Sequence, residues 1–151
     1  MVLAKHYHLC VGGRFPLLES RSLSIDMLNH ISIGASSLPA AKAFYDAALS
    51  ALGYRCLSED ASSLGYGSET VEFWVLKSEK PVPDEAASGL HICFTAGTKD
   101  GVNRFHAVGL RHGGRDHGKP GTRPDYGSDY YAAFLKDPDG YRVEAYCRTA
   151  P

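Results

Sequence analysis

The sequence predicts an α+β fold in which two βαβββ units form a curled mixed sheet around a central cleft. The first observation behind this prediction is an internal repeat. A shift of 61 residues places Asn29–Ile33 on Leu90–Phe94, and with them His30 on His91. A small repeat that cannot bury its own sheet face packs against its copy. The two halves are therefore expected to form a single domain.

The second observation is a later match between the last strands of the two halves. Residues 70–74 (TVEFW) align with residues 142–146 (RVEAY), which places Glu72 on Glu144. The offset there is 72 (144 − 72), so the second half carries an insertion of 11 residues (72 − 61). Two histidines and two glutamates at equivalent positions would converge on one point between the copies. Imidazole and carboxylate groups together form a ligand set for a divalent metal.

The first half is expected to begin with a strand over residues 28–34. Side chains alternate between the faces of a strand, so Ile31 and Ile33 point one way while His30 and Ser32 point the other. This alternation separates the histidine from the apolar face.

A helix is expected to follow, from Leu38-Pro39 to about Leu52. Ser37 can cap its first turn, and proline is favoured at an early helical position. Alanines and Phe44 form an apolar stripe at helical spacing, and Gly53 suits the position just after the helix.

Three further strands complete the first half, over residues 54–57, 62–66 and 70–77. Short polar or glycine-containing turns separate them. Residues 78–88, which are polar and contain two prolines, are expected to link the halves.

The second half repeats this order. A strand is expected over residues 90–96, followed by a helix capped by Thr98 that runs to about Leu110. Two strands then follow, over residues 129–136 and 141–148. The turn Asp137-Pro138-Asp139-Gly140 joins them.

Residues 113–128 contain five glycines and two prolines and are interpreted as a long loop. A loop of this length inside a compact domain is more often functional than not. Its basic residues Arg115, Lys119 and Arg123 either bind a carboxylate or phosphate of a substrate or keep the loop soluble.

Strand alternation places the candidate ligands on the faces away from the helices. His30, His91 and Glu144 can all lie on concave faces by this criterion. Glu72 shares its face with Trp74 and an apolar neighbour, which makes that face more crowded.

The composition is that of an ordinary globular protein, with 44% hydrophobic and 22% charged residues in a chain of 151. The formal net charge of −1 predicts no attraction to nucleic acid or to an anionic membrane. No stretch approaches the roughly 20 apolar residues of a membrane span. Four cysteines without a CxxC pair indicate a reducing compartment, and we expect a cytoplasmic protein.

Residues 1–26 lie outside the repeat and are interpreted as an N-terminal extension, with a targeting segment as the alternative and Met27 as a possible second start. The predicted domain covers residues 27–151, with its two repeats at residues 27–77 and 89–148.

Four segments resemble the vicinal oxygen chelate superfamily, the glyoxalase, bleomycin-resistance and extradiol-dioxygenase group. They are Asn29–Ile33, Ala43-Phe44-Tyr45, Leu90–Phe94 and Lys136–Glu144, which contains the DPDG turn. The resemblance covers residues 27–148. It implies paired βαβββ units, a divalent metal in the cleft and a dimer.

By this resemblance, His30, His91 and Glu144 fall on metal-ligand positions, and Glu72 falls near a fourth. The metal would be Zn, Ni, Co, Mn or Fe(II), and Glu144 would serve as both ligand and catalytic base. Trp74, Lys119, Arg123 and Tyr130 are the candidate residues for binding substrate. Phe73 and Trp74 depart from the glyoxalase I pattern.

The first function predicted from these residues is a glyoxalase-like lyase or isomerase that acts on a small oxygen-chelating substrate, possibly a thiol adduct. An Fe(II) extradiol dioxygenase would use a similar ligand set. A metal-free protein that binds a small antibiotic-type molecule is the alternative outside enzymes. The expected partners are a small molecule and a second copy of the chain.

Overall fold

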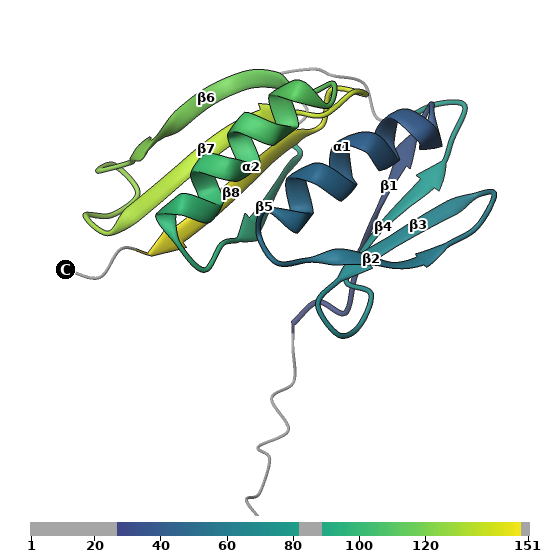
Figure 1. The fold of residues 1–151 in the computed structure, drawn as a ribbon, viewed down its shortest axis with the longest axis horizontal. Helices are drawn as coiled ribbons and strands as arrows, with labels where there is room; N and C mark the ends of the chain where they lie inside the picture. The colour runs from purple at the N-terminus through teal and green to yellow at the C-terminus, as the bar shows by residue number, and fades with distance from the viewer. Residues whose placement is uncertain (1–26, 82–88, 149–151) are drawn as a thin grey trace, which may run out of the picture.

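The computed structural model describes residues 27–81 and 89–148 and shows two four-stranded sheets, each with one helix (Figure 1). The first unit contains β1 (Ile31–Ala35), α1 (Leu38–Ser50), β2 (Arg55–Glu59), β3 (Ser63–Gly67) and β4 (Phe73–Lys77). The second unit contains β5 (His91–Thr95), α2 (Lys99–Arg111), β6 (Arg115–Thr122), β7 (Tyr130–Lys136) and β8 (Arg142–Arg148).

Both sheets have the same strand order, β1-β4-β3-β2 in the first unit and β5-β8-β7-β6 in the second. The first and last strands of each unit run parallel, and the other neighbours run antiparallel. The two sheets are thus mixed and topologically alike, which confirms the α+β fold of paired βαβββ units.

The two helices begin 61 residues apart, as the repeat predicts. Ser37 accepts a hydrogen bond from the Ala40 amide at 3.3 Å, and Thr98 accepts one from the Gly101 amide at 3.0 Å. These bonds satisfy amides that have no partner within the first turn of a helix. The predicted helix starts are therefore confirmed.

The prediction of a loop over residues 113–128 is wrong for residues 115–122, which form β6. This strand lies at the edge of its sheet, and its pairing with β7 shifts register twice. An edge strand with bulges tolerates proline, so Pro120 does not interrupt it. Gly118 also has a packing role, because a Cβ there would lie 2.9 Å from the Phe134 ring.

The two helices hold the two units together. Helices α1 and α2 pack against each other (Figure 1), and Phe44 and Phe105, which the repeat makes equivalent, are both fully buried. Tyr45 on α1 also donates a 2.7 Å hydrogen bond to the buried carboxylate of Asp137, in the turn between β7 and β8. Core packing and this hydrogen bond therefore tie the first unit to the second.

The predicted extension (residues 1–26) and most of the predicted linker (residues 82–88) lie outside the described residues. Neither described helix is long and apolar enough to cross a membrane.

Candidate functional site

The carboxylate of Glu144 is the centre of the candidate site. It lies in the middle of β8, on the sheet face away from α2, and is only 2% exposed. Its Oε2 is 2.9 Å from Nε2 of His91, and its Oε1 accepts a 2.8 Å hydrogen bond from the Tyr130 hydroxyl. Two partners thus hold both oxygens of a buried carboxylate in place.

Tyr130 remains a hydrogen-bond donor at neutral pH. Burial, together with the hydrogen bond to Glu144, raises the pKa of its phenol far above the usual value of 10. Because the phenol keeps its proton, it can orient the carboxylate without competing for a proton.

Cys93 lies directly beside Glu144, because the two residues are register partners in the parallel pair β5–β8. The residue is exposed, yet burial of its thiol and the nearby Glu144 charge raise the pKa of Cys93 to about 12. The thiol is therefore protonated at neutral pH and is not an activated nucleophile.

Aromatic rings surround the His91–Glu144 pair on this sheet face. Tyr130 stacks on Tyr146 with centroids 4.0 Å apart, and the Phe134 ring lies 6.1 Å from the imidazole of His91. The Arg123 guanidinium lies 5.3 Å from the centre of the Phe134 ring. These rings offer a planar, apolar surface next to a polar centre.

Of the other predicted binding residues, Lys119 is exposed on β6. The pKa of Asp116 on the same strand is lowered mainly by its hydrogen bond with His106, and the Lys119 charge adds to this. The Lys119 carbonyl accepts a 2.6 Å hydrogen bond from Arg123. Arg123 and Tyr130 lie near the His91–Glu144 pair, because Tyr130 bonds to Glu144 and Arg123 lies over the Phe134 ring beside His91.

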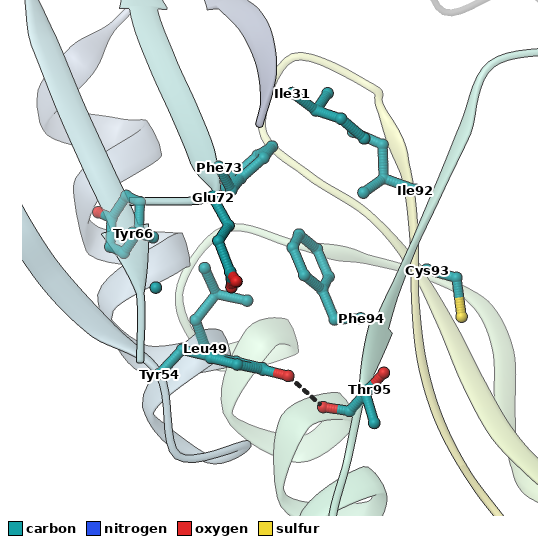
Figure 2. A pocket seen from close by; sticks show the side chains of 11 residues that line it. Ile31, Leu49, Tyr54, Tyr66, Glu72, Phe73, Ile92, Cys93, Phe94 and Thr95 are labelled. Atoms are coloured by element: carbon teal, nitrogen blue, oxygen red, sulfur yellow. Dashed lines mark hydrogen bonds between the residues drawn. The ribbon is translucent and has the colours of Figure 1, made fainter. Parts of the chain in front are cut away.

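His30 and Glu72 belong to the first unit and lie away from this pair. His30 is exposed just before β1, with Nδ1 2.8 Å from the side-chain oxygen of Asn29. Glu72 precedes β4 and projects into a pocket between the two units (Figure 2). Within the described ranges, no three His, Cys, Asp or Glu side chains are close enough together to hold a metal ion. One chain thus brings together only two of the four predicted ligands.

The strand registers correct the predicted equivalence of Glu72 and Glu144. In the first unit Ser32 pairs with Trp74, and in the second unit its repeat partner Cys93 pairs with Glu144. The offset at the last strands is thus 70 (144 − 74) rather than 72. Trp74 therefore occupies the position in the first sheet that Glu144 occupies in the second.

The Trp74 indole lies over Gly65 of the neighbouring strand β3. A Cβ at Gly65 would come within 2.9 Å of the indole, so the glycine leaves room for the ring. The outer face of the first sheet thus presents a broad aromatic group.

Three residues near the site were not predicted to belong to it: Cys93, Phe134 and Tyr146. The available signal was strand parity, because Cys93 and Tyr146 share faces with His91 and Glu144 in the sequence. Phe134 could not be found in this way, because it is placed opposite Glu144 by the register of β7 against β8, which strand parity does not determine.

Comparisons with known proteins agree with this architecture. The sequence model of one protein family, the Glyoxalase/Bleomycin resistance protein/Dioxygenase superfamily, matches residues 27–145. A comparison with curated proteins found no match.

Several solved structures are similar to this chain. A glyoxalase/bleomycin resistance protein from Albidiferax ferrireducens T118 is 30% identical, with a TM-score of 0.71, over 82% of this chain and 100% of that one. A glyoxalase-related enzyme from Fulvimarina pelagi is 15% identical, with a TM-score of 0.64, over 81% and 88%. A family enzyme from Burkholderia phytofirmans PsJN is 17% identical, with a TM-score of 0.58, over 78% and 95%. The last two likenesses concern the fold alone.

Proposed function

The chain belongs to the glyoxalase/bleomycin resistance protein/dioxygenase superfamily, and on that premise we propose that it is a metal-dependent enzyme. Its substrate would be a small molecule with two neighbouring oxygen atoms. The observation that carries this proposal is the pairing of His91 with the buried carboxylate of Glu144 at 2.9 Å.

The donor atoms of this pair suit a divalent ion. An imidazole nitrogen and a carboxylate oxygen are ligands for Zn, Ni, Co, Mn and Fe(II). Tyr130 supplies the outer hydrogen bond that commonly orients such a carboxylate. A bound ion would polarise the two substrate oxygens and stabilise the negative charge that develops on them.

Within the described residues, one chain brings only two of the predicted ligands together, so a third protein ligand would come from another chain. We propose that His30 of a second copy fulfils this role in a two-fold homodimer. His30 is exposed at the start of β1, and β1 is an edge strand of its sheet, which makes both available to a partner. Each dimer would then contain two equivalent sites.

Several residues of this chain would have distinct roles around the substrate. Glu144 supplies the carboxylate of the pair and would accept a proton from a carbon next to a carbonyl. Tyr130 holds the other oxygen of Glu144. Tyr146 and Phe134 provide apolar contacts, and Arg123 can bind an anionic substituent.

The reaction we propose first is a glyoxalase-like isomerisation or lyase step, since Glu144 can transfer a proton and lies among aromatic groups. One observation favours an Fe(II) dioxygenase as the second candidate. Trp74 stands at the position of a second carboxylate, and two histidines with one carboxylate are the ligand set of non-haem iron oxygenases.

Metal titration of an untagged protein tests the proposal. We expect about one divalent ion per chain, and loss of binding in His91→Ala. His112→Ala is a suitable control because its imidazole bonds to the Val108 carbonyl at the end of α2. Equal binding by all three proteins would refute the metal site.

Two activity assays then separate the reactions. Turnover of the hemithioacetal of methylglyoxal and glutathione, with each metal supplied in turn, would support the lyase. Oxygen uptake with a catechol and Fe(II) would support the dioxygenase. Binding of an apolar molecule without metal, together with inactivity in both assays, would instead support a binding protein.

A further inference from the structure

A pocket lies at the junction of the two units, beside β5 (Figure 2). Its walls are mainly apolar. The main contributors are Ile31, Leu49 and Phe73 from the first unit and Ile92 and Phe94 from the second. Glu72 contributes the one carboxylate, and Figure 2 shows it pointing into the space between these walls.

The other polar groups of the pocket already have partners. The Tyr54 hydroxyl donates a 2.9 Å hydrogen bond to the Thr95 carbonyl, and the Tyr66 hydroxyl donates one of 2.9 Å to Asp46. The Glu72 carboxylate has no hydrogen-bond or salt-bridge partner among the described residues. None of the described residues lining the pocket is basic. The pocket therefore carries one negative charge, on a residue that is exposed to solvent.

The charge of Glu72 acts across the pocket. Together with burial, which is the larger cause, it raises the pKa of the Tyr54 phenol above the usual value of 10. A charge that affects a phenol within the pocket would also attract a cationic group and repel an anionic one.

The size of the pocket matches one ring with a short chain. Its volume is about 200 Å³. An apolar cavity of roughly 150 Å³ is enough to bind benzene. The remaining volume accommodates two or three further heavy atoms.

We propose that this pocket binds an arylalkylammonium ion, a single aromatic ring that carries a short chain with a terminal ammonium group. The ring would pack among Leu49, Phe73 and Phe94, and the ammonium group would pair with Glu72. The pocket differs from the metal site in its lining, which contains Cys93 but not His91, Tyr130 or Glu144.

Titration of the intact protein with three probes of nearly equal shape tests the proposal. The probes are phenethylamine, 2-phenylethanol and phenylacetate, and binding is followed by calorimetry and by amide chemical shifts. We expect the amine to bind up to about fivefold more tightly than the alcohol, which is the increment of an exposed ion pair. Phenylacetate should bind most weakly. The shifts should centre on Tyr54, Glu72 and Phe94.

Variants assign any preference to Glu72. Glu72→Gln should abolish the preference for the amine while it keeps the affinity for the alcohol. Glu69→Gln removes the same charge from an exposed residue nearby and should change nothing. Ile31→Trp, at a residue that is 38% exposed, should fill the pocket and weaken all three probes. Equal affinity for amine and alcohol in the natural protein, or a preference that survives Glu72→Gln, would overturn the proposal.

Discussion

Trp74 on β4 stands in the first sheet at the position that Glu144 on β8 holds in the second. The parallel pairs β1–β4 and β5–β8 establish this, because Ser32 and Cys93 are repeat partners and pair with Trp74 and Glu144 respectively. The two units thus share strand order and register but differ in the residue at this position. One unit presents a carboxylate there and the other an indole.

This asymmetry predicts how metal binding responds to substitution in the first unit. In the proposed dimer, Trp74→Glu would supply a carboxylate from the chain that also supplies His30, at the position equivalent to Glu144. We expect it to tighten divalent metal binding by about tenfold, since an added charged ligand raises affinity. Glu72→Gln should leave metal affinity unchanged, because Glu72 points into the separate pocket.

Metal titration by calorimetry measures both effects, with Glu144→Gln as the variant that loses a proposed ligand. If Glu72→Gln weakened metal binding as much as Glu144→Gln does, Glu72 would be a ligand after all.

The incorrect alignment of Glu72 with Glu144 has a simple physical origin. Side chains on a strand alternate with a period of two. An alignment that is wrong by one residue is therefore recognisable, because it moves every side chain to the other face, whereas an alignment that is wrong by two residues leaves every side chain on its face. Sequence parity therefore placed Glu72 and Trp74 on one face without choosing between them. Only the pairing of β4 with β1 makes that choice.

Other features followed from local chemistry and were predictable. The helix starts depend on Ser37 and Thr98, whose side chains cap the first turns as expected. Strand β6 was missed because glycine and proline are loop residues in most contexts. Its pairing depends on the partner strand β7, which includes Phe134. Residues 115–122 alone contain no information about that partner.

A mixing experiment tests the proposal that two chains share each site. His30→Ala and His91→Ala homodimers should each bind little metal, because every site lacks one ligand. In a random mixture about half of the dimers are mixed, and each mixed dimer has one intact site. About a quarter of the natural metal capacity should therefore return. Light scattering checks that the protein exceeds the 16.3 kDa of a single chain. No recovery after verified exchange would mean that the two histidines do not act across a dimer.

Tyr130 is expected to position Glu144. Tyr130→Phe removes the hydroxyl that donates to Oε1 of Glu144 at 2.8 Å while keeping a ring to stack on Tyr146. Loss of such an outer hydrogen bond commonly lowers metal affinity by about 10–100-fold. Tyr131→Phe is the matched control, since that hydroxyl bonds to Asn103 instead. Equal metal affinities for the two variants would contradict the role of Tyr130.

The buried carboxylate of Asp137 is expected to make stability depend on pH. Burial, the largest cause, raises the pKa of Asp137 above the ordinary value of 3.8, although hydrogen bonds from Tyr45 and from the Tyr141 amide act in the opposite direction. A carboxyl whose pKa is raised on folding binds a proton more readily in the folded state. Its contribution to stability is therefore fully present below pH 3.8 and is lost as the pH rises through the folded pKa.

Urea unfolding of the natural protein and of Asp137→Asn, at pH 3 and pH 7, isolates this contribution because all other carboxyl groups are shared. We expect the natural protein to lose stability relative to Asp137→Asn as the pH rises. Tyr45→Phe should steepen that loss, since it removes a hydrogen bond that favours the ionised carboxylate, and it should cost about 1–3 kcal/mol at neutral pH. A natural protein that instead gained stability relative to Asp137→Asn between these pH values would show that the hydrogen bonds from Tyr45 and the Tyr141 amide outweigh the burial of Asp137.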